Sequence, residues 1–228
     1  MTRANGDNEP VQLITTPRRW TVVVPMKSSA RGKSRIDVDP VLRRALARAM
    51  VMDTVEAAAG TADVGEVLVV ADDAEDARPL VQMQGVRSLL AAATGLNEAI
   101  GEGLRSLPPD APVAVLPGDL PSLTSEELQR ALAAAARHEF AVVADRQGTG
   151  TTLLTATAAG RLQPRYGGAS FARHVAAGAM PLEVPPGSGL RRDVDAAADL
   201  AGVLGARTLA VLADAACPTE LCAARITG

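Results

Sequence analysis

Short apolar runs alternate with longer amphipathic stretches along the 228-residue chain. The apolar runs are rich in β-branched residues and predict buried strands, whereas the stretches rich in Ala, Leu and Arg predict helices. The predicted strands cover residues 20–24, 66–71, 86–90, 112–116, 140–144, 152–155 and 207–212, and residues 181–184 are predicted to be extended. The predicted helices cover residues 40–59, 73–83, 95–107, 170–178 and 195–204, and one more begins at Thr124.

Strands that alternate with helices predict a mostly parallel sheet with helices on both faces. We therefore expect an α/β fold, a single-domain three-layer sandwich. The chain is 47% hydrophobic, which is enough for one good core, and no linker divides it. Residues 1–17 are polar and aperiodic, so we expect residues 1–18 to be a disordered leader and residues 19–228 to form the domain. Ligands of such sheets bind at the carboxyl ends of the strands.

Two of the predicted helices carry signals at their ends. Asp39 is placed to cap the helix at 40–59, and Gly60 is placed to end it. Thr124 and Glu127, three residues apart, form a capping-box pattern. These residues locate the start of both helices.

The composition excludes several classes of function. The formal net charge is −3 and the chain has only one Trp, one Tyr and two Phe, whereas nucleic-acid binders usually carry a basic surplus and stacking aromatic residues. No apolar run is long enough for a membrane span and the N-terminus lacks a signal-peptide pattern, so we expect a cytoplasmic protein. Cys217 and Cys222 have a poor spacing for zinc, and we expect free thiols.

A basic loop, PMKSSARGKSR at 25–35, follows the first predicted strand and contains both lysines of the chain. Its cations, small hydroxyl donors and backbone N–H groups predict a polyphosphate cradle. The candidate nucleotide-binding residues of this loop are Pro25, Lys27, Ser28, Arg31, Lys33 and Arg35. The loop is not a Walker A motif, and the alternative interpretation is a solvated basic turn.

Three acidic residues are candidate metal ligands. Asp119 follows the apolar run 112–116 in a turn rich in Pro and Gly, and Asp193 and Asp195 flank Val194, so that in extended backbone both would face the same side. Carboxylates in these places suit Mg²⁺ that bridges nucleotide phosphates. The alternatives are that Asp119 caps backbone donors of its turn and that Asp195 caps the following helix.

The segment ATGLNEAI at 93–100 offers further contacts to a nucleotide. Thr94 and Gly95 stand before a predicted helix and Asn97 lies in its first turn. Backbone N–H groups and a side-chain amide there could bind a purine edge or a phosphate. A capped helix start explains the same residues equally well.

A third unusual segment follows Thr155 and leads to YGGASFARH at 166–174. Its Gly-Gly-Ala-Ser run at a predicted helix start is suited to a small phosphate or carboxylate, together with Thr151 and Thr152. Ser170 is also a natural N-cap, so that binding and capping compete for it. We expect His174 to be structural, because no nucleophile pattern accompanies it.

Taken in chain order, these segments resemble the 2-phospho-L-lactate/phosphoenolpyruvate guanylyltransferases of coenzyme F-420 biosynthesis. That family is a branch of the nucleotide-diphospho-sugar transferase-like fold and is related to the molybdenum-cofactor nucleotidyltransferases. The resemblance covers residues 19–212. It implies transfer of GMP from GTP to phosphoenolpyruvate or 2-phospho-L-lactate, with release of pyrophosphate. The matching positions imply acceptor binding at Thr152, Gly167 and Ser170 and Mg²⁺ binding at Asp119, Asp193 and Asp195. Many relatives differ at residues 167–169.

The chemistry itself needs no protein nucleophile, because the attacking group is an anionic phosphate. Catalysis would consist of positioning and charge neutralisation, with Lys27, Lys33 and Asp119 as the catalytic candidates. The actinobacterial-looking composition favours phosphoenolpyruvate as acceptor. The alternatives are another nucleotidyltransferase of this fold that uses CTP or ATP, a non-catalytic nucleotide-binding regulator, and a phosphatase-like hydrolase. The sequence leaves open whether the chain forms a homodimer.

Overall fold

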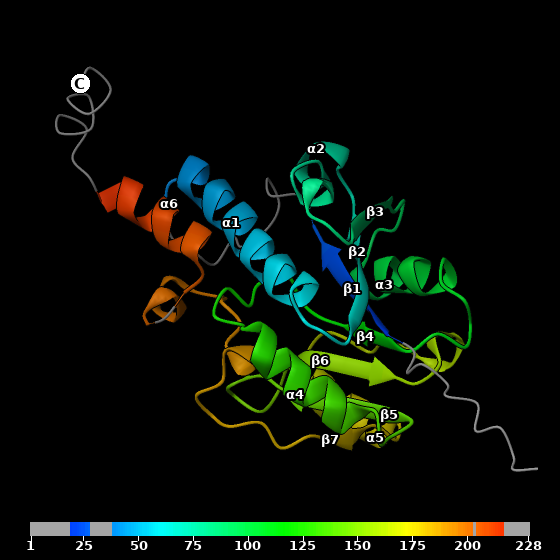
Figure 1. Cartoon of the computed structure of the whole chain (residues 1–228). Coiled ribbons are helices and arrows are strands. Elements are labelled where there is room, and N and C mark those ends of the chain that lie inside the picture. Colours follow the sequence, from blue (N-terminus) through cyan, green and yellow to red (C-terminus); the bar gives the residue numbers. More distant parts are fainter. Residues whose placement is uncertain (1–18, 28–37, 203, 217–228) are drawn as a thin grey trace, which may run out of the picture.

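The computed structural model describes residues 19–27, 38–202 and 204–216. Within these residues, seven strands form one sheet that is covered by helices (Figure 1). The predictions that fall outside the described residues concern the leader at 1–18, the loop residues Ser28, Arg31, Lys33 and Arg35, and the cysteines Cys217 and Cys222.

The elements follow one another in the predicted alternation over most of the chain. The strands are β1 (Trp20–Met26), β2 (Val64–Ala71), β3 (Val86–Leu90), β4 (Val113–Val115), β5 (Phe140–Ala144), β6 (Thr151–Ala156) and β7 (Met180–Pro181). The α-helices are α1 (Pro40–Ala59), α2 (Ala74–Ala77), α3 (Leu96–Arg105), α4 (Ser125–Ala135), α5 (Ser170–Ala176) and α6 (Ala206–Ala216). Short 3-10 helices are η1 (Leu80–Gln82), η2 (Ala159–Arg161), η3 (Gly189–Arg191) and η4 (Ala197–Leu200).

The strand order in the sheet is β3-β2-β1-β4-β6-β5-β7. The pairs β1–β2, β1–β4, β2–β3 and β5–β7 are parallel, so the predicted mostly parallel sheet is confirmed. The chain moves outward from β1 to β2 and β3 and then returns to place β4 on the other side of β1. The strand order therefore reverses between β1 and β4, which is where sheets of this kind bind ligands.

The strand β6 runs antiparallel to both of its neighbours, β4 and β5. Val115 at the end of β4 pairs with Leu154, so the beginning of β6 lies at the edge where β4 ends. We expected the segment after Thr155 at the ligand edge, but the reversed direction sends the end of β6 away from it. The residues of β6 that lie at that edge are Thr151 and Thr152.

Alternate residues of β1 divide the core between the two faces of the sheet. Val22 and Val24 pack into a cluster with α1 and α4, whereas Val23 packs with α3 and Tyr166. Because consecutive side chains of a strand point to opposite faces, a strand that is apolar throughout must be covered on both. The predicted three-layer sandwich is thus confirmed.

The predicted helix ends of α1 and α4 are also confirmed. The Asp39 carboxylate accepts hydrogen bonds from the N–H groups of Val41 and Leu42, at 2.8 and 3.3 Å. Thr124 and Glu127 form the reciprocal capping box at the start of α4. Each cap satisfies donors that the first turn of a helix leaves without an intrahelical partner.

The C-terminal part of the chain differs from the prediction, because residues 207–212 belong to helix α6 and not to a strand. The first N–H groups of α6 are capped by Asp53, which lies in α1. Its carboxylate accepts hydrogen bonds from the N–H of Arg207 at 3.1 Å, the N–H of Thr208 at 2.9 Å and the Thr208 hydroxyl at 2.7 Å. A cap supplied from another helix leaves no local signal, so the β-branched residues of this segment were misleading.

Two predicted helices are shorter in the structure. The helix predicted at 73–83 is divided into α2 and η1, because Pro79 lacks the N–H that a continuous helix would need. The helix predicted at 195–204 is reduced to η4. The Asp199 carboxylate, which lies in η4, accepts hydrogen bonds from the N–H groups of Asp195 and Ala196 and so caps its start. Asp195 is therefore not the N-cap that we considered as an alternative.

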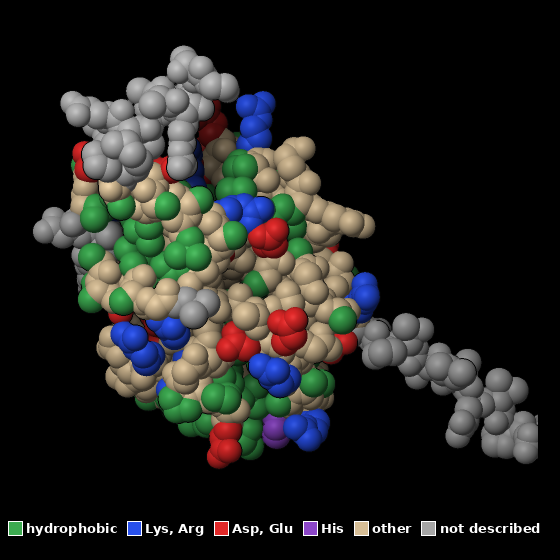
Figure 2. All heavy atoms as spheres, turned by 60° about the vertical axis from the view of Figure 1, so that its left-hand side comes forward, with side chains coloured by type: hydrophobic (Ala, Val, Ile, Leu, Met, Phe, Trp, Pro, Cys, Tyr) green, Lys and Arg blue, Asp and Glu red, His purple; other side chains and the backbone are tan. Residues whose placement is uncertain are grey.

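The surface is of mixed charge where it can be seen. On the face drawn in Figure 2, acidic and basic side chains of the described residues are interspersed, and no broad basic area is visible there. Among the described helices, none combines the length and the apolar character that crossing a membrane requires.

We expect the Asp53 cap to contribute strongly to stability. In Asp53→Ala, α6 loses the acceptor of three hydrogen bonds, and the free energy of unfolding in urea should fall by about 2 kcal/mol. Glu56→Ala is the matched control, because Glu56 also pairs with Arg207 but is exposed. The control should lose less than about 1 kcal/mol. Equal losses in the two variants would show that Asp53 does not cap α6.

Candidate active site

A cavity of about 470 Å³ opens beside the carboxyl ends of β1, β2 and β3. Its wall is made by the end of β1 with Lys27, by the end of β2 with Asp72, and by the segment 91–96 that leads from β3 into α3. Four of the predicted nucleotide-binding residues line it, namely Pro25, Lys27, Thr94 and Gly95. The structure thus brings two segments together that are almost 70 residues apart in the sequence.

Two carboxylates of α3 hold the wall of this cavity. Glu98 accepts hydrogen bonds from the N–H of Thr94 at 3.2 Å and from its hydroxyl at 3.1 Å. Glu102 accepts one from the N–H of Ala92 at 3.3 Å. The helix therefore fixes the segment before it, and the Thr94 hydroxyl is engaged with Glu98 in this state of the protein.

Asn97 does not line the cavity, although we predicted it as a nucleotide-binding residue. Its amide bonds the backbone of Tyr166 instead, with Nδ2 donating to the carbonyl at 3.0 Å and Oδ1 accepting from the N–H at 2.8 Å. Both polar atoms of the amide are used in this way. The amide consequently connects α3 with the segment that contains the predicted acceptor-binding residues.

The loop after β4, residues 117–121, carries Asp119 and is fixed by helix α1. The Thr54 hydroxyl accepts a hydrogen bond from the N–H of Leu120 at 3.1 Å. A Cβ atom on Gly118 would lie 3.0 Å from a methyl carbon of Val51, which is closer than carbon atoms normally approach. A side chain at this position would require Val51 to shift, so the loop packs closely against α1, at the carboxyl ends of the strands.

A second segment is held against this loop by its backbone. The N–H of Val194 donates to the carbonyl of Asp119 at 3.0 Å, and the Val194 side chain is buried. Gly189 lies so close to Ser122 that a Cβ atom would overlap the Ser122 carbonyl, and its N–H donates to Glu127 at 2.9 Å. These contacts bring Asp193 next to Asp119, as the sequence predicted for the two acids.

The electrostatics of Asp193 reflect this neighbourhood. Burial and, to a smaller extent, the negative charges of Asp119, Asp195 and Asp145 together raise the pKa of its carboxyl to about 6. Negative charge is thus concentrated where a cation would be favourable. In the part of the chain that the structure describes, no three His, Cys, Asp or Glu side chains are close enough to hold a metal ion by themselves. The three-acid metal site of Asp119, Asp193 and Asp195 therefore stays a prediction.

Two residues that support this region were missed by the sequence analysis. Asp145 accepts hydrogen bonds from the N–H groups of Thr149 and Gly150, at 2.9 and 2.8 Å, and so shapes the turn between β5 and β6. Arg191 donates from its guanidinium to the carbonyl groups of Asp145 and Val184, at 2.9 and 3.3 Å. Both act on backbone groups, which a sequence pattern does not reveal.

The predicted acceptor-binding residues lie together beside the start of β6. Thr152 is buried, and Ser170 is buried with its hydroxyl donating to Thr151 at 3.1 Å. Gly167 is exposed, and its φ of +120° is a conformation that favours glycine. The N-cap of α5 is Ala169, so the predicted capping role of Ser170 is wrong: its hydroxyl reaches β6 and not the helix backbone.

His174 is a buried part of the same region. Its Nε2 accepts a hydrogen bond from the N–H of Arg165 at 2.9 Å, so Nδ1 carries the proton and faces the Thr151 hydroxyl at 3.0 Å. Its ring packs edge to face against Tyr166, with centroids 5.2 Å apart. Burial lowers the pKa of His174 to about 4, and the charges of Arg173 and Arg165 lower it too. The imidazole is therefore neutral and hydrogen-bonded at both ring nitrogens, which is consistent with the structural role that we expected.

The lowered pKa of His174 predicts a pH dependence of stability. The unfolded chain takes up a proton near pH 6.5, whereas the folded chain does so only near pH 4, so acid favours unfolding between these values. Relative to His174→Gln, the wild type should lose roughly 1–3 kcal/mol as the pH falls from 6.5 to 4. Urea denaturation at a series of pH values measures this difference. A difference between the two proteins that does not change with pH would contradict the assignment.

Solved structures with the same fold confirm the architecture. A protein described as a nucleotide-diphospho-sugar transferase, from Desulfovibrio desulfuricans, aligns with a TM-score of 0.62 over 85% of this chain and 94% of its own, at 17% identity. A Mycobacterium tuberculosis protein solved as a complex with manganese aligns with a TM-score of 0.53 over 80% of this chain and 96% of its own, at 18% identity. At these identities the likeness concerns the fold alone.

Curated relatives and a family model carry the comparison further. The phosphoenolpyruvate guanylyltransferase of Streptomyces coelicolor is 42% identical over 204 residues, which are 86% of this chain and 96% of that protein. The enzyme of the same name from Geodermatophilus obscurus is 42% identical over 214 residues, 89% of this chain and 98% of that protein. The model of the family "Guanylyl transferase CofC like" matches residues 20–204. The chain therefore belongs to the CofC-like guanylyl transferase family.

Proposed function

We propose that this chain transfers GMP from GTP to phosphoenolpyruvate and releases pyrophosphate, as a step of coenzyme F-420 biosynthesis. The observation that carries the proposal is the arrangement at one edge of the sheet. A cavity with Lys27 at its wall lies on the side of β2 and β3, and Asp119 and Asp193 lie on the side of β4. Family membership and the names of the relatives support this choice of reaction.

The nucleotide half is the cavity beside β1. The predominantly small side chains of the segment 91–95 leave room for a flat base. Lys27 stands where β1 ends and the basic loop begins, so the triphosphate would extend from the cavity toward that loop. We assign the phosphate contacts to Lys27 and to the residues that follow it in the chain, Ser28, Arg31, Lys33 and Arg35.

A divalent cation such as Mg²⁺ would be held by Asp119 and Asp193, with Asp195 as a third candidate. The residues present fit such an ion, because several carboxylates lie together there: after burial, the negative charges of Asp119, Asp195 and Asp145 also raise the pKa of Asp193. Mg²⁺ commonly takes one or two carboxylates and completes its ligands with substrate phosphates and water. When bound, the ion would neutralise charge on the phosphate groups.

The acceptor half is the region of Thr152, Gly167 and Ser170. An oxygen of the acceptor phosphate attacks the α-phosphorus of GTP, the bond to the β-phosphate breaks, and pyrophosphate leaves. No proton has to be removed from the attacking group, which agrees with the neutral, fully engaged state of His174. The chain contributes by orienting two anions and by offsetting their charge.

The proposal predicts that GTP, Mg²⁺ and phosphoenolpyruvate together give pyrophosphate. Asp119→Asn should lower kcat at least about 100-fold, because a carboxylate beside the reacting phosphates is lost while the fold remains. Asp63→Asn is the matched control, since Asp63 pairs with Gln129 just before the amino end of β2, away from the carboxyl ends of the strands. This variant should keep the wild-type kcat. A coupled pyrophosphate assay and circular dichroism provide the two readouts.

Several outcomes of this assay would refute the proposal. Equal release of pyrophosphate from CTP would contradict the guanylyl assignment, and release that needs no acceptor would indicate a hydrolase. Higher activity with 2-phospho-L-lactate than with phosphoenolpyruvate would show that phosphoenolpyruvate is not the preferred acceptor. Full activity of Asp119→Asn would remove the metal role of this acid.

A further inference from the structure

The structure assigns to Asn97 the task of positioning the acceptor loop, which we define as residues 165–170. In this role Asn97 acts through the backbone of Tyr166 and touches neither the base nor the acceptor. The inference rests on the proposed function for the identity of the acceptor. It goes beyond that function because it names a residue that does not line the nucleotide cavity and yet decides how well the acceptor is bound.

The clamp itself consists of two hydrogen bonds on one peptide residue. Asn97 donates from Nδ2 to the Tyr166 carbonyl at 3.0 Å and accepts from the Tyr166 N–H at 2.8 Å. A side-chain amide that satisfies the donor and the acceptor of the same residue imitates the pairing of a neighbouring strand. It therefore fixes both the position and the orientation of the backbone at the start of the acceptor loop.

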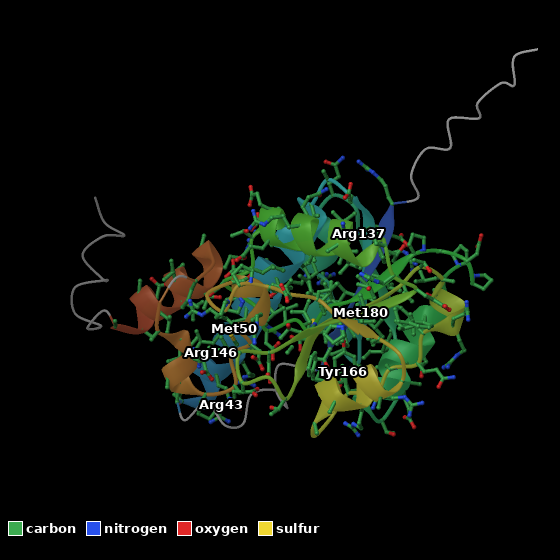
Figure 3. The ribbon with its side chains drawn as sticks, turned by 90° about the horizontal axis from the view of Figure 1, so that it is seen from below. Arg43, Met50, Arg137, Arg146, Tyr166 and Met180 are labelled. Carbon is green, nitrogen blue, oxygen red and sulfur yellow. The ribbon has the colours of Figure 1, made fainter. Side chains whose placement is uncertain are left out.

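The loop is held from the other side by His174. The N–H of Arg165 donates to His174, so three backbone groups of residues 165 and 166 are bound by side chains of two different helices. The Tyr166 ring is buried against the sheet and packs on the His174 ring (Figure 3). Within the loop Tyr166 and Ser170 are buried, whereas Arg165 and the stretch from residue 167 to 169 are exposed.

That exposed part has a backbone that needs external support. Gly167 has a φ of +120°, and Ala169 has a φ of +53°, the single non-glycine residue with positive φ among the described residues. Glycine adopts such a φ readily, whereas for the alanine it is unfavourable by itself and persists where the surroundings determine it. With Ser170 bonded to Thr151 at one end, the Asn97 clamp supplies the restraint at the other.

The clamp also joins the two halves of the site. Asn97 lies in the first turn of α3, and the residues just before it, Thr94–Leu96, line the nucleotide cavity. Because Asn97 bonds Tyr166, a ligand that orders the first turn of α3 also orders the start of the acceptor loop, 69 residues later in the chain. The acceptor loop is thus aligned to the nucleotide by one side chain and not by the sheet alone.

The decisive test is a split between the Michaelis constants of the two substrates. In Asn97→Ala the KM for phosphoenolpyruvate should rise roughly tenfold or more, because two hydrogen bonds of the loop are lost. The KM for GTP should stay within about twofold, since no cavity-lining residue is changed. Asn97→Asp keeps an acceptor for the Tyr166 N–H but loses the donor, and it should also raise the KM for phosphoenolpyruvate without changing the preference for GTP over ITP or ATP.

Gln129→Ala is the matched control. Gln129 also bridges two elements through its amide, accepting from the N–H of Asp63 at 3.1 Å and donating to its carboxylate, but its partner Asp63 directly precedes β2 and so lies at the opposite end of that strand from the candidate site. It should lower stability without changing either KM. A rise in the KM for GTP, a changed base preference, or an unchanged KM for phosphoenolpyruvate in the Asn97 variants would overturn the inference.

A second measurement tests the clamp without catalysis. Amide hydrogen exchange of the segment 165–170 should become about tenfold faster in Asn97→Ala and stay as in the wild type in Gln129→Ala. If the wild type does not transfer GMP to phosphoenolpyruvate, the proposed function fails, but the exchange data still decide about the clamp. Unchanged exchange in a folded Asn97→Ala or Asn97→Asp protein would show that Asn97 does not hold the loop.

Discussion

The backbone hydrogen bond from Val194 to Asp119 is the contact on which the candidate site depends. It is 3.0 Å long and ties a segment near the end of the domain to the loop after β4. Val194 is buried, and its neighbour Asp193 lies close enough to Asp119 that, after burial, like charge helps to raise the pKa of Asp193 to about 6. A region in which acidic side chains repel one another is well suited to a divalent cation that also binds phosphate groups.

The remaining parts of the site take their places relative to this contact. Helix α1 fixes the Asp119 loop through Thr54, and the strand order places that loop next to β1, whose end leads into the nucleotide cavity. The reversed direction of β6 brings Thr152 to the same edge. Asn97 then connects the cavity wall to the acceptor loop. The candidate nucleotide cavity, the acids and the candidate acceptor region therefore lie at the same ends of the strands.

The sequence predicted what depends on local pattern and on chain order. Apolar runs located most strands of the sheet, and the structure brings the loop of Asp119 and the segment of Asp193 together, while their role as metal ligands stays a prediction. It was wrong where a distant residue decides, as in α6, whose cap comes from Asp53 in α1. It also assigned Asn97 to the nucleotide, because an amide in a first helical turn has the same local pattern whether it faces a base or a backbone 69 residues away.

The most direct test of the account is the place of a metal ion in a ternary complex. Crystals of the protein with Mn²⁺, a GTP analogue with a methylene bridge between its α- and β-phosphates, and phosphoenolpyruvate would locate the ion by its anomalous scattering. The account predicts a peak at about 2.0–2.2 Å from carboxylate oxygens of Asp119 and Asp193 and from the α-phosphate, with guanine in the cavity beside β1. A metal ion bound away from both acids, or a guanine outside that cavity, would contradict it.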